Sequence, residues 1–448
     1  MKELRIKDSE ILAYIKESFK VSPDRINKII SNFHSEMAKG LAGDASSMEM
    51  IPTFVEMPNG QETGNFIALD LGGTNFRVQA VALSGKGRVR VTAERKFVLR
   101  KEDITGTGKQ LFDFIADSIK GFMHTNKISR SEKRNLGFTF SFPVEQSNIA
   151  DGRLLCWNKG FSADNVIGVD VVKLLNAALK RKRINNIKVA ALLNDTVGTL
   201  VTRAYSDRNC DLGVILGTGT NACYPEKIAG ISKWRGLKTA SGHMIINMEW
   251  GNFNKMPRTF YDEKLDKVSS NPGRQRLEKM VSGYYLGEVT RLILCDLVKR
   301  KMLFRGNVFA ALAVPYSFKT EYMSYVIVDN SKKLDKVRKL LEKLGIFGST
   351  YRDRKLLKKI CKITKRRSAC ISAAAIAAAL NWIDPGLSKR HTIAIDGSLF
   401  AKSPGYDIYM IRTLRNLFGN RVNRIKLVLT KDGSGKGAAI VAAIATRM

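Results

Sequence analysis

An apolar strand that ends in an acid and two glycines is the feature that most constrains this chain. Residues 66–78 read FIALDLGGTNFRV. Glycines let backbone N–H groups approach phosphate oxygens, and the carboxylate of Asp70 is placed for a hydrated Mg²⁺. A second strand follows at once, without the helix that follows a P-loop or a dinucleotide-binding loop. The run therefore predicts a hairpin around a phosphate tail, although an ordinary glycine hairpin has the same pattern.

Length and composition predict a globular protein of two domains. The chain has 448 residues, too many for one compact core, and 44% of them are hydrophobic. Its charged beginning lacks the apolar stretch of a signal peptide, and no apolar run is long enough to span a membrane. The 6 cysteines form no CxxC pair, which suits a reducing compartment. The small number of histidines, 4 in all, argues against a histidine-based metal centre. We therefore expect a cytoplasmic protein without a transmembrane segment, with export by another route left open.

The positive charge is large and partly concentrated. The formal net charge is +34, and residues 331–367 hold 15 Lys or Arg against 3 Asp or Glu. Such a segment attracts polyanions or an anionic membrane, but apolar residues at helical spacing between the charges favour a solvated helix face. No RNA-binding motif, zinc finger or helix-turn-helix accompanies the charge. We expect no specific nucleic-acid partner, and association with an anionic surface stays an alternative.

Hydrophobic periodicity predicts alternating strands and helices. A long helical segment over 8–42 is broken once, at Pro23, and three strands with glycine turns follow over 65–100. Further helices are expected over 110–123, 170–182, 196–205 and from Ser434 onward, and further strands over 136–140, 187–193, 212–216, 392–395 and 425–429. The strand and turn over 69–75 recur in similar form over 214–221. Such a pair of hairpins, one in each domain, would hold a triphosphate from both sides.

A carboxylate at the end of one strand is a candidate general base. Asp195 follows the apolar run 189–193 and precedes a helix, and open α/β sheets place reactive groups at such strand ends. As a helix cap, Asp195 would have a purely structural role. Glu249 and Glu278 are candidate acceptors for sugar hydroxyls, or else ordinary surface acids.

Taken together, the motifs resemble the hexokinase/glucokinase family of the actin-like sugar kinase superfamily. The matching runs occur in order along nearly the whole chain, over 69–77, 136–143, 157–161, 194–199, 217–222, 248–251, 271–273, 278–288, 395–398 and 432–437. The resemblance implies an α/β, two-domain, actin-like (ribonuclease H-like) fold with an active-site cleft between a small and a large domain. The small domain would comprise 52–195 and 432–448, and the large domain 1–51 and 196–431.

The resemblance also implies the activity and the sugar site. The activity would be that of an ATP-dependent hexokinase, which transfers the γ-phosphoryl group of MgATP to the 6-hydroxyl of glucose or a related hexose, the first step of glycolysis. Asp195 would be the catalytic base, Lys159 would stabilise developing charge, and 143–158 would be a mobile sugar-recognition loop. The implied sugar-binding residues are Ser141, Asn158, Lys159, Asn194, Asp195, Asn221, Glu249 and Glu278.

Residues for the nucleotide follow from the same resemblance. On the side of the first hairpin they are Asp70, Gly72, Gly73, Thr74, Asn75 and Arg77. Of these, Asp70 would act on Mg²⁺ through water. Thr218 and Gly219 would face them from the second hairpin. Those expected near the adenosine are Asp396, Gly397, Ser398 and Ser434, with Thr320 and Ser324 as further contacts. A monomer or a homodimer fits these expectations equally.

One departure from the family pattern bears on specificity. Asn158 stands where the family usually has threonine in the run Trp-Thr-Lys-Gly-Phe, which puts sugar affinity and selectivity in doubt more than catalysis. A sugar sensor with little turnover is the rival interpretation, because a fold alone does not fix a function. The presence of Asp195, Lys159, Asp70 and both hairpins argues against a sensor.

Overall fold

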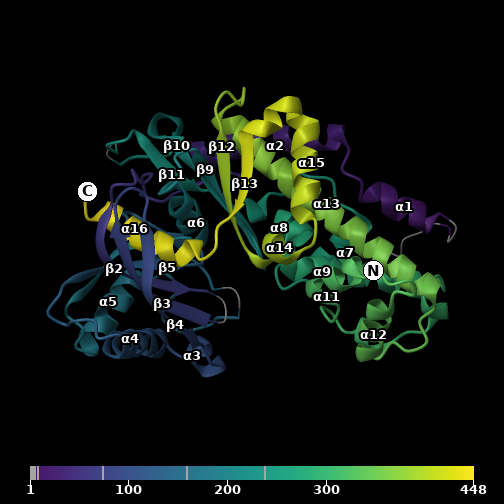
Figure 1. The fold of residues 1–448 in the computed structure, drawn as a ribbon, viewed down its shortest axis with the longest axis horizontal. Helices are drawn as coiled ribbons and strands as arrows, with labels where there is room; N and C mark the ends of the chain where they lie inside the picture. The colour runs from purple at the N-terminus through teal and green to yellow at the C-terminus, as the bar shows by residue number, and fades with distance from the viewer. Residues whose placement is uncertain (1–6, 8–9, 73–74, 158–159, 237–238, 448) are drawn as a thin grey trace.

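The computed structural model describes residues 7, 10–72, 75–157, 160–236 and 239–447. It has two α/β halves, each built on its own sheet (Figure 1). One sheet has the strand order β4-β3-β2-β5-β8. Its strands are β2 (Thr63–Leu71), β3 (Asn75–Ser84), β4 (Val89–Val98), β5 (Arg134–Phe140) and β8 (Ile187–Leu193).

The second sheet has the strand order β1-β11-β10-β9-β12-β13. Its strands are β1 (Ile51–Pro52), β9 (Cys210–Leu216), β10 (Thr220–Lys227), β11 (His243–Asn247), β12 (His391–Asp396) and β13 (Ile425–Leu429). A small hairpin, β6 (Val144–Glu145) and β7 (Arg153–Leu154), lies outside both sheets.

The two sheets repeat one topology. In the first, β2 pairs antiparallel with β3 and parallel with β5, which pairs parallel with β8. In the second, β9 pairs antiparallel with β10 and parallel with β12, which pairs parallel with β13. The similar runs 69–75 and 214–221 therefore occupy equivalent hairpins, as the sequence predicts.

Helices cover both faces of the first sheet. One face carries α4 (Gly108–Thr125) and α5 (Val171–Arg181), and the apolar stripe of α4 is fully buried there, with Phe112, Ile115 and Phe122 in one core. The other face carries α16 (Gly433–Ala445), and α6 (Asp195–Ala204) packs between α16 and the second sheet. Gly137 permits the close approach of α16, because a Cβ atom there would lie 1.9 Å from the backbone oxygen of Ala438.

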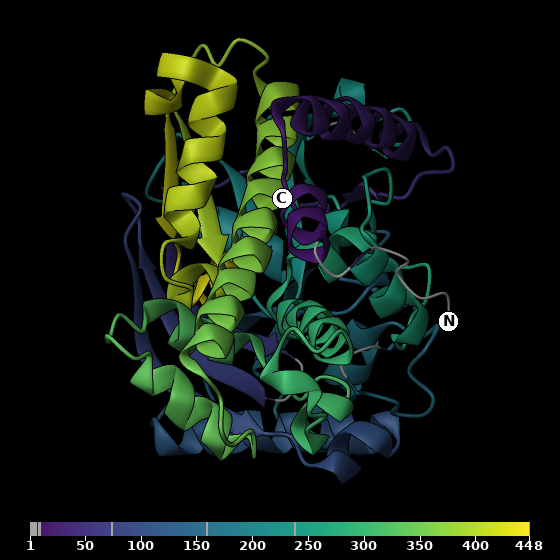
Figure 2. The same cartoon turned by 90° about the vertical axis from the view of Figure 1, so that its right-hand side faces the viewer.

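Most other helices pack around the second sheet, in the half of the molecule on the right of Figure 1. They are α1 (Ile11–Ser18), α2 (Pro23–Ala42), α7 (Phe260–Val268), α8 (Arg276–Val281), α9 (Gly283–Lys299), α10 (Ala310–Ala313), α11 (Thr320–Val328), α12 (Asp335–Lys343), α13 (Tyr351–Ile383), α14 (Ser398–Lys402) and α15 (Tyr406–Phe418). Figure 2 shows the long α13 crossing one side of the molecule beside α15. The remaining short helices are α3 (Lys101–Thr105), η1 (Ile228–Gly230), η2 (Trp250–Asn252), η3 (Phe304–Gly306) and η4 (Gly419–Arg424).

Two predictions about the helical segments are confirmed. The N-terminal segment is split at Pro23, which is the first residue of α2, and the hydroxyl of Ser22 accepts a hydrogen bond from the N–H of Arg25 as its cap. The basic segment forms α12 and the first part of α13, with Val337 and Leu341 of α12 buried. In the parts of the chain that the structure describes, no helix has the length and hydropathy needed to cross a membrane.

A buried histidine ties β12 to its surroundings. The side chain of His391 is fully buried, with Nδ1 2.8 Å from Oδ2 of Asp211 and Nε2 3.1 Å from Oδ2 of Asp384. Burial works to lower the pKa of His391, but hydrogen bonds and charge from Asp211, together with the hydrogen bond to Asp384, raise it above its usual value. Because both ring nitrogens face carboxylate oxygens, both carry protons and the ring is an imidazolium.

Candidate active site

The predicted site residues gather where parallel strands end. Because β2, β5 and β8 run parallel, their C-terminal ends share one edge of the sheet, and Asp70, Ser141 and Asn194 lie at these ends. Ser141 is buried, and its N–H donates to the carbonyl of Leu71 at 3.3 Å. The parallel pairing thereby brings Asp70, Ser141 and Asn194 to the same edge of the sheet.

A charged cluster joins the first hairpin to α16. Oδ2 of Asp70 accepts hydrogen bonds from Nη2 of Arg77 at 2.8 Å and from Oγ of Ser434 at 2.7 Å. Nη1 of Arg77 also contacts Oδ1 of Asp432. Although burial works against the charge on Arg77, these two carboxylates raise its pKa, so the guanidinium stays positive. Asp70 and Ser434, which are 364 positions apart in the chain, are thereby held together beside the turn of the first hairpin.

The turn of the second hairpin lies against two other glycine-containing turns. The N–H of Gly217 closes the turn on the carbonyl of Gly219 at 3.0 Å, and the carbonyl of Gly217 accepts from the N–H of Gly283 at 2.7 Å, where α9 begins. Gly397 has φ of +122°, and a Cβ atom there would lie 2.4 Å from the carbonyl oxygen of Leu216. Gly397 is therefore required for the close packing of the turn that precedes α14.

Asp396 connects the two sheets electrostatically. It ends β12, and its Oδ1 accepts from the N–H of Gly397 at 2.6 Å. Burial raises the pKa of Asp396, the N–H groups of Gly397 and Gly433 lower it, and the negative charge of Asp195 adds to the rise. The charge of Asp195 thus disfavours the ionised form of Asp396, in the same direction as burial.

An amide–carboxylate network lies beside Asp195. Nδ2 of Asn221 on β10 donates to Oδ1 of Asn247 at 2.8 Å and to Oε1 of Glu249 at 3.1 Å, and it lies 3.5 Å from Oδ1 of Asn194. Nδ2 of Asn247 donates to the same oxygen of Glu249 at 2.8 Å. Glu249 has a left-handed backbone, with φ of 50°, which is uncommon for a residue with a side chain. The network holds one Glu249 oxygen in place next to the helix that begins at Asp195.

Glu278 is held against the second hairpin. Its Oε2 accepts from the N–H of Thr220 at 2.9 Å, and a Cβ atom at Gly219 would lie 2.6 Å from the same oxygen. Because glycine has no side chain, position 219 leaves room for the carboxylate of Glu278. The second hairpin thus lies next to a carboxylate on one side and the start of α9 on the other.

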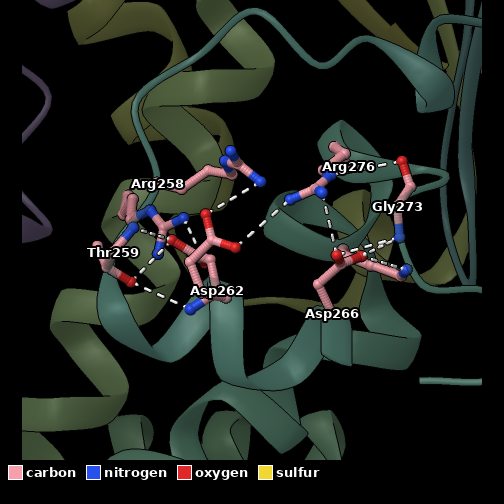
Figure 3. Close-up of polar contacts among 9 residues, drawn as sticks. Arg258, Thr259, Asp262, Asp266, Gly273 and Arg276 are labelled. Atoms are coloured by element: carbon pink, nitrogen blue, oxygen red, sulfur yellow. Dashed lines mark hydrogen bonds and ion pairs between the residues drawn. The ribbon is translucent and has the colours of Figure 1, made fainter. Parts of the chain in front are cut away.

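A buried ion pair to Asp266 fixes α8, the helix that carries Glu278. Figure 3 shows Asp266 with its partners Gly273 and Arg276. Nζ of Lys279 lies 2.8 Å from Oδ1 of Asp266, with side-chain exposures of 3% and 8%. Asp266 also accepts from the N–H of Gly273 at 3.1 Å and pairs with Arg276 at 3.2 Å. Since Lys279 follows Glu278 directly, this network sets the position of the neighbouring carboxylate.

A small pocket lies between the two halves. Its walls come from the loop after β5 on one side and from β1, β11 and η2 on the other. The lining residues are Ile51, Thr53, Phe142, Pro143, Val144, Gln146, Asn194, Asn247 and Glu249. The start of the predicted sugar-recognition loop therefore faces two members of the amide–carboxylate network.

The remaining predicted residues either fall outside the described part of the chain or take part through the backbone. Gly73, Thr74, Asn158 and Lys159 fall outside the described residues. Gly72 and Asn75 close the first turn through a 3.2 Å backbone hydrogen bond, Ser398 begins α14, and Thr218 accepts from the N–H of Tyr284 at 3.1 Å.

Thr320 and Ser324 reach the site only indirectly. They lie one turn apart on α11, and Oγ1 of Thr320 accepts from the N–H of Gly287 on α9 at 2.8 Å. Among the residues that the structure describes, α9 is thus what connects Thr320 to the second hairpin, whose turn contacts the beginning of that helix.

The helix-cap interpretation of Asp195 is wrong. Asn194 is the N-cap of α6, with Oδ1 accepting from the N–H of Thr196 at 3.0 Å, and Asp195 is the first helical residue. Two further residues, Asn247 and Asp432, belong to the site but were not predicted. Both stand within motifs of the sequence, directly before Met248-Glu249 and Gly433-Ser434, yet their roles depend on partners far away in the chain.

The donor set at the first hairpin fits a hydrated divalent cation. Within the described residues, the hydrogen bonds to Asp70 reach Oδ2, which leaves Oδ1 for a metal-bound water. Mg²⁺ in proteins is commonly held by one or two carboxylates together with waters and substrate phosphates. Asp70 beside a glycine turn offers this combination.

Comparisons with known proteins assign the family. Two hexokinase family models match residues 11–205 and 211–444. Hexokinase-2 of Oryza sativa subsp. japonica is 41% identical over 97% of this chain and 90% of its own length. Human hexokinase-3 is 40% identical over 96% of this chain, which spans 46% of that protein.

Structural comparison agrees. The solved structure of a hexokinase from Schistosoma mansoni complexed with glucose superposes with a TM-score of 0.88 at 36% identity, covering 98% of this chain and all of that one. A second solved hexokinase structure gives a TM-score of 0.82 at 30% identity. The expected two-domain, actin-like sugar kinase fold is confirmed. The chain therefore belongs to the hexokinase family of ATP-dependent hexose kinases.

Proposed function

We propose that this protein transfers the γ-phosphoryl group of MgATP to the 6-hydroxyl of glucose or a related hexose, with Asp195 as the general base. The observation that carries the proposal is the placement of Asp195 at the start of α6, directly after Asn194, whose side chain meets the Asn221–Asn247–Glu249 network. Hydrogen-bond acceptors for a sugar and turns suited to phosphates thus flank one carboxylate. A base at that point would accept the proton of the attacking hydroxyl.

In this mechanism the network orients the sugar. Carboxylate oxygens of Glu249 and Glu278 accept hydrogen bonds from sugar hydroxyls, while the amides of Asn194 and Asn221 bind hydroxyls as donors or acceptors. Holding the hydroxyl next to Asp195 contributes to rate because a positioned reactant has already lost its translational freedom. Ser141, Asn158 and Lys159 complete the proposed sugar site.

The glycine turns bind the nucleotide in this proposal. Backbone N–H groups of the two hairpins face the phosphates from opposite sides, with Thr218 and Gly219 on one side. Mg²⁺, held through water by Asp70, would neutralise charge on the β- and γ-phosphates. Positively charged Lys159 would stabilise the charge that develops on transfer.

The domain division proposed from the sequence suits this site. Residues 52–195 and 432–448 would form a small domain that moves relative to 1–51 and 196–431. Closure of the 143–158 loop over the sugar would exclude water, which otherwise competes for the phosphoryl group. The small pocket between Phe142 and Glu249 is the place where such closure would act.

The test is glucose-dependent ADP release by the purified protein and by an Asp195→Asn variant. We expect the substitution to lower kcat by a factor of about 10² to 10⁴, the usual contribution of a general base, with glucose binding by calorimetry retained. The shape of the side chain is preserved, so the fold and the sugar contacts should persist.

The matched control is Asp117→Asn, at an exposed position on α4 that pairs with Lys182. It should leave turnover unchanged. Full activity of Asp195→Asn would refute the base assignment. Glucose binding without any turnover by the parent protein would instead support a sugar sensor.

A further inference from the structure

We propose that α12 and the first half of α13 form a docking surface for an anionic lipid membrane. Lysines and arginines are exposed on both helices of this basic face, which consists of Lys332, Lys333, Lys336, Lys339, Lys343, Arg352, Lys355, Lys359, Lys362 and Arg366. The proposal is independent of the phosphoryl-transfer reaction, because none of these residues lies in the proposed active site.

The charges on α13 form a continuous stripe. Arg352, Lys355, Lys359, Lys362 and Arg366 follow one another at spacings of three or four residues, so their side chains lie on the same face of the helix. At 1.5 Å per residue the stripe is about 21 Å long. The opposite face of α13 is buried in the large apolar core. The charged face of α13 therefore stays exposed to solvent.

These charges have no carboxylate partner among the described residues, and Nζ of Lys355 lies 5.3 Å from the centre of the Tyr351 ring. In the described part of the chain, the exposed cations of the basic face form no salt bridge, whereas Arg338 between them pairs with Glu342 at 3.0 Å. A second basic run, residues 180–183, is by contrast partly neutralised, because Arg181 pairs with Asp113 and Lys182 with Asp117. Unpaired cations on a regular surface attract a polyanionic partner.

An exposed aromatic ring stands between the two helices. Phe347 is 69% exposed in the loop that joins α12 to α13, and the flanking Gly345 and Gly348 both have positive φ angles, which indicates a tight loop. Tyr351, the first residue of α13, is 48% exposed. Cations beside protruding aromatic rings are typical of surfaces that lie on a bilayer, with the rings at the boundary between headgroups and acyl chains.

This combination favours a membrane over a nucleic acid. Both partners are anionic and both would respond to the stripe, but insertion of Phe347 gains free energy only from an apolar phase. A duplex would be held by the cations alone, since phosphate contacts need no apolar side chain. The contribution of Phe347 therefore separates the two partners experimentally.

The experiment is sedimentation of the full chain with vesicles of phosphatidylcholine and phosphatidylserine, compared with vesicles of phosphatidylcholine alone. We expect binding to the anionic vesicles only, weakened by added salt. The combined variant K339Q, K355Q, K359Q and K362Q should lose affinity by about a hundredfold or more, because each lysine near an anionic surface contributes roughly a factor of five. Phe347→Ser alone should also weaken binding, by about tenfold.

Two control variants match these changes elsewhere on the surface. K127Q, K133Q, K173Q and K180Q remove the same number of exposed charges, and Ile167→Ser replaces a residue that is 59% exposed. Both controls should bind vesicles like the parent. Equal losses in the control and test variants, or no vesicle binding by the parent, would overturn the proposal. Binding to duplex DNA that K339Q, K355Q, K359Q and K362Q abolish and Phe347→Ser leaves intact, without vesicle binding, would identify a nucleic-acid surface instead.

Discussion

Removing the buried cation of α8 is a direct test of how Glu278 is positioned. In Lys279→Met, a side chain of similar length replaces the lysine, but Asp266 loses the ammonium group 2.8 Å from its Oδ1. The carbonyl of Asn271 also loses its hydrogen bond from Nζ, at 2.7 Å. The change therefore breaks the link between α7, the loop after it and α8 while adding no bulk.

The size of the effect follows from burial. Breaking a buried ion pair by removing one partner costs about 3–5 kcal/mol, because the remaining charge is left without compensation. Here Arg276 and the N–H of Gly273 still contact Asp266, so we expect the lower end, about 3 kcal/mol. Loosening α8 should also displace Glu278 and raise the KM for glucose, on the order of tenfold for a loss of about 1.4 kcal/mol in sugar contacts.

Two measurements separate stability from positioning. Urea unfolding followed by tryptophan fluorescence gives the loss of stability, and buried Trp250, in the short helix that packs against α8, is a nearby reporter. Steady-state kinetics give KM and kcat, of which only KM should change, since Asp195 is untouched. The control is Arg338→Met, which removes the cation of an exposed ion pair and should cost less than about 1 kcal/mol. An unchanged KM for glucose in a clearly destabilised Lys279→Met protein would refute the positioning role.

Two other substitutions give opposite patterns. Gly219→Ala places a Cβ atom 2.6 Å from Oε2 of Glu278, a flexible side-chain end, so we expect a raised glucose KM with unfolding free energy nearly unchanged; an unaltered KM would count against Glu278 as a sugar ligand. His391→Gln should lower the thermal midpoint most in mildly acidic solution. Because the folded pKa of His391 lies above its unfolded value of about 6.5, its stabilisation is complete below that pH and is lost as pH rises through the folded pKa. A difference in thermal midpoint that stays constant as the pH rises from about 6.5 into the alkaline range would contradict this assignment.

Local patterns were enough to predict the hairpins and the strand ends. Apolar runs followed by glycine-containing turns specify β2–β3 and β9–β10 through interactions between neighbours in the sequence, so both hairpins are where the sequence places them. The same holds for the break at Pro23, which follows from ring geometry. Asp195 follows a strand, as predicted, but the alternative in which it caps the helix is wrong, because Asn194 has the same capping ability one residue earlier.

The polar networks could not be predicted in the same way. Asn247 acquires its role from Asn221 on the neighbouring strand, and Asp432 from Arg77, which lies 355 positions earlier in the chain. Such pairs depend on how elements pack, and nothing in their local sequence distinguishes them from surface polar residues. The family resemblance identified a candidate site residue only where a matched motif carried that residue as part of the family's site.

The position of α16 has a consequence for how the protein is made. This last helix covers one face of the first sheet, and its Ser434 carbonyl accepts a hydrogen bond from Thr139 on β5 at 2.8 Å. During synthesis the strands of that sheet leave the ribosome long before the helix that covers them. The first half of the nascent chain must therefore wait with an apolar face uncovered until α16 has been synthesised, and during that time it is a natural client for chaperones.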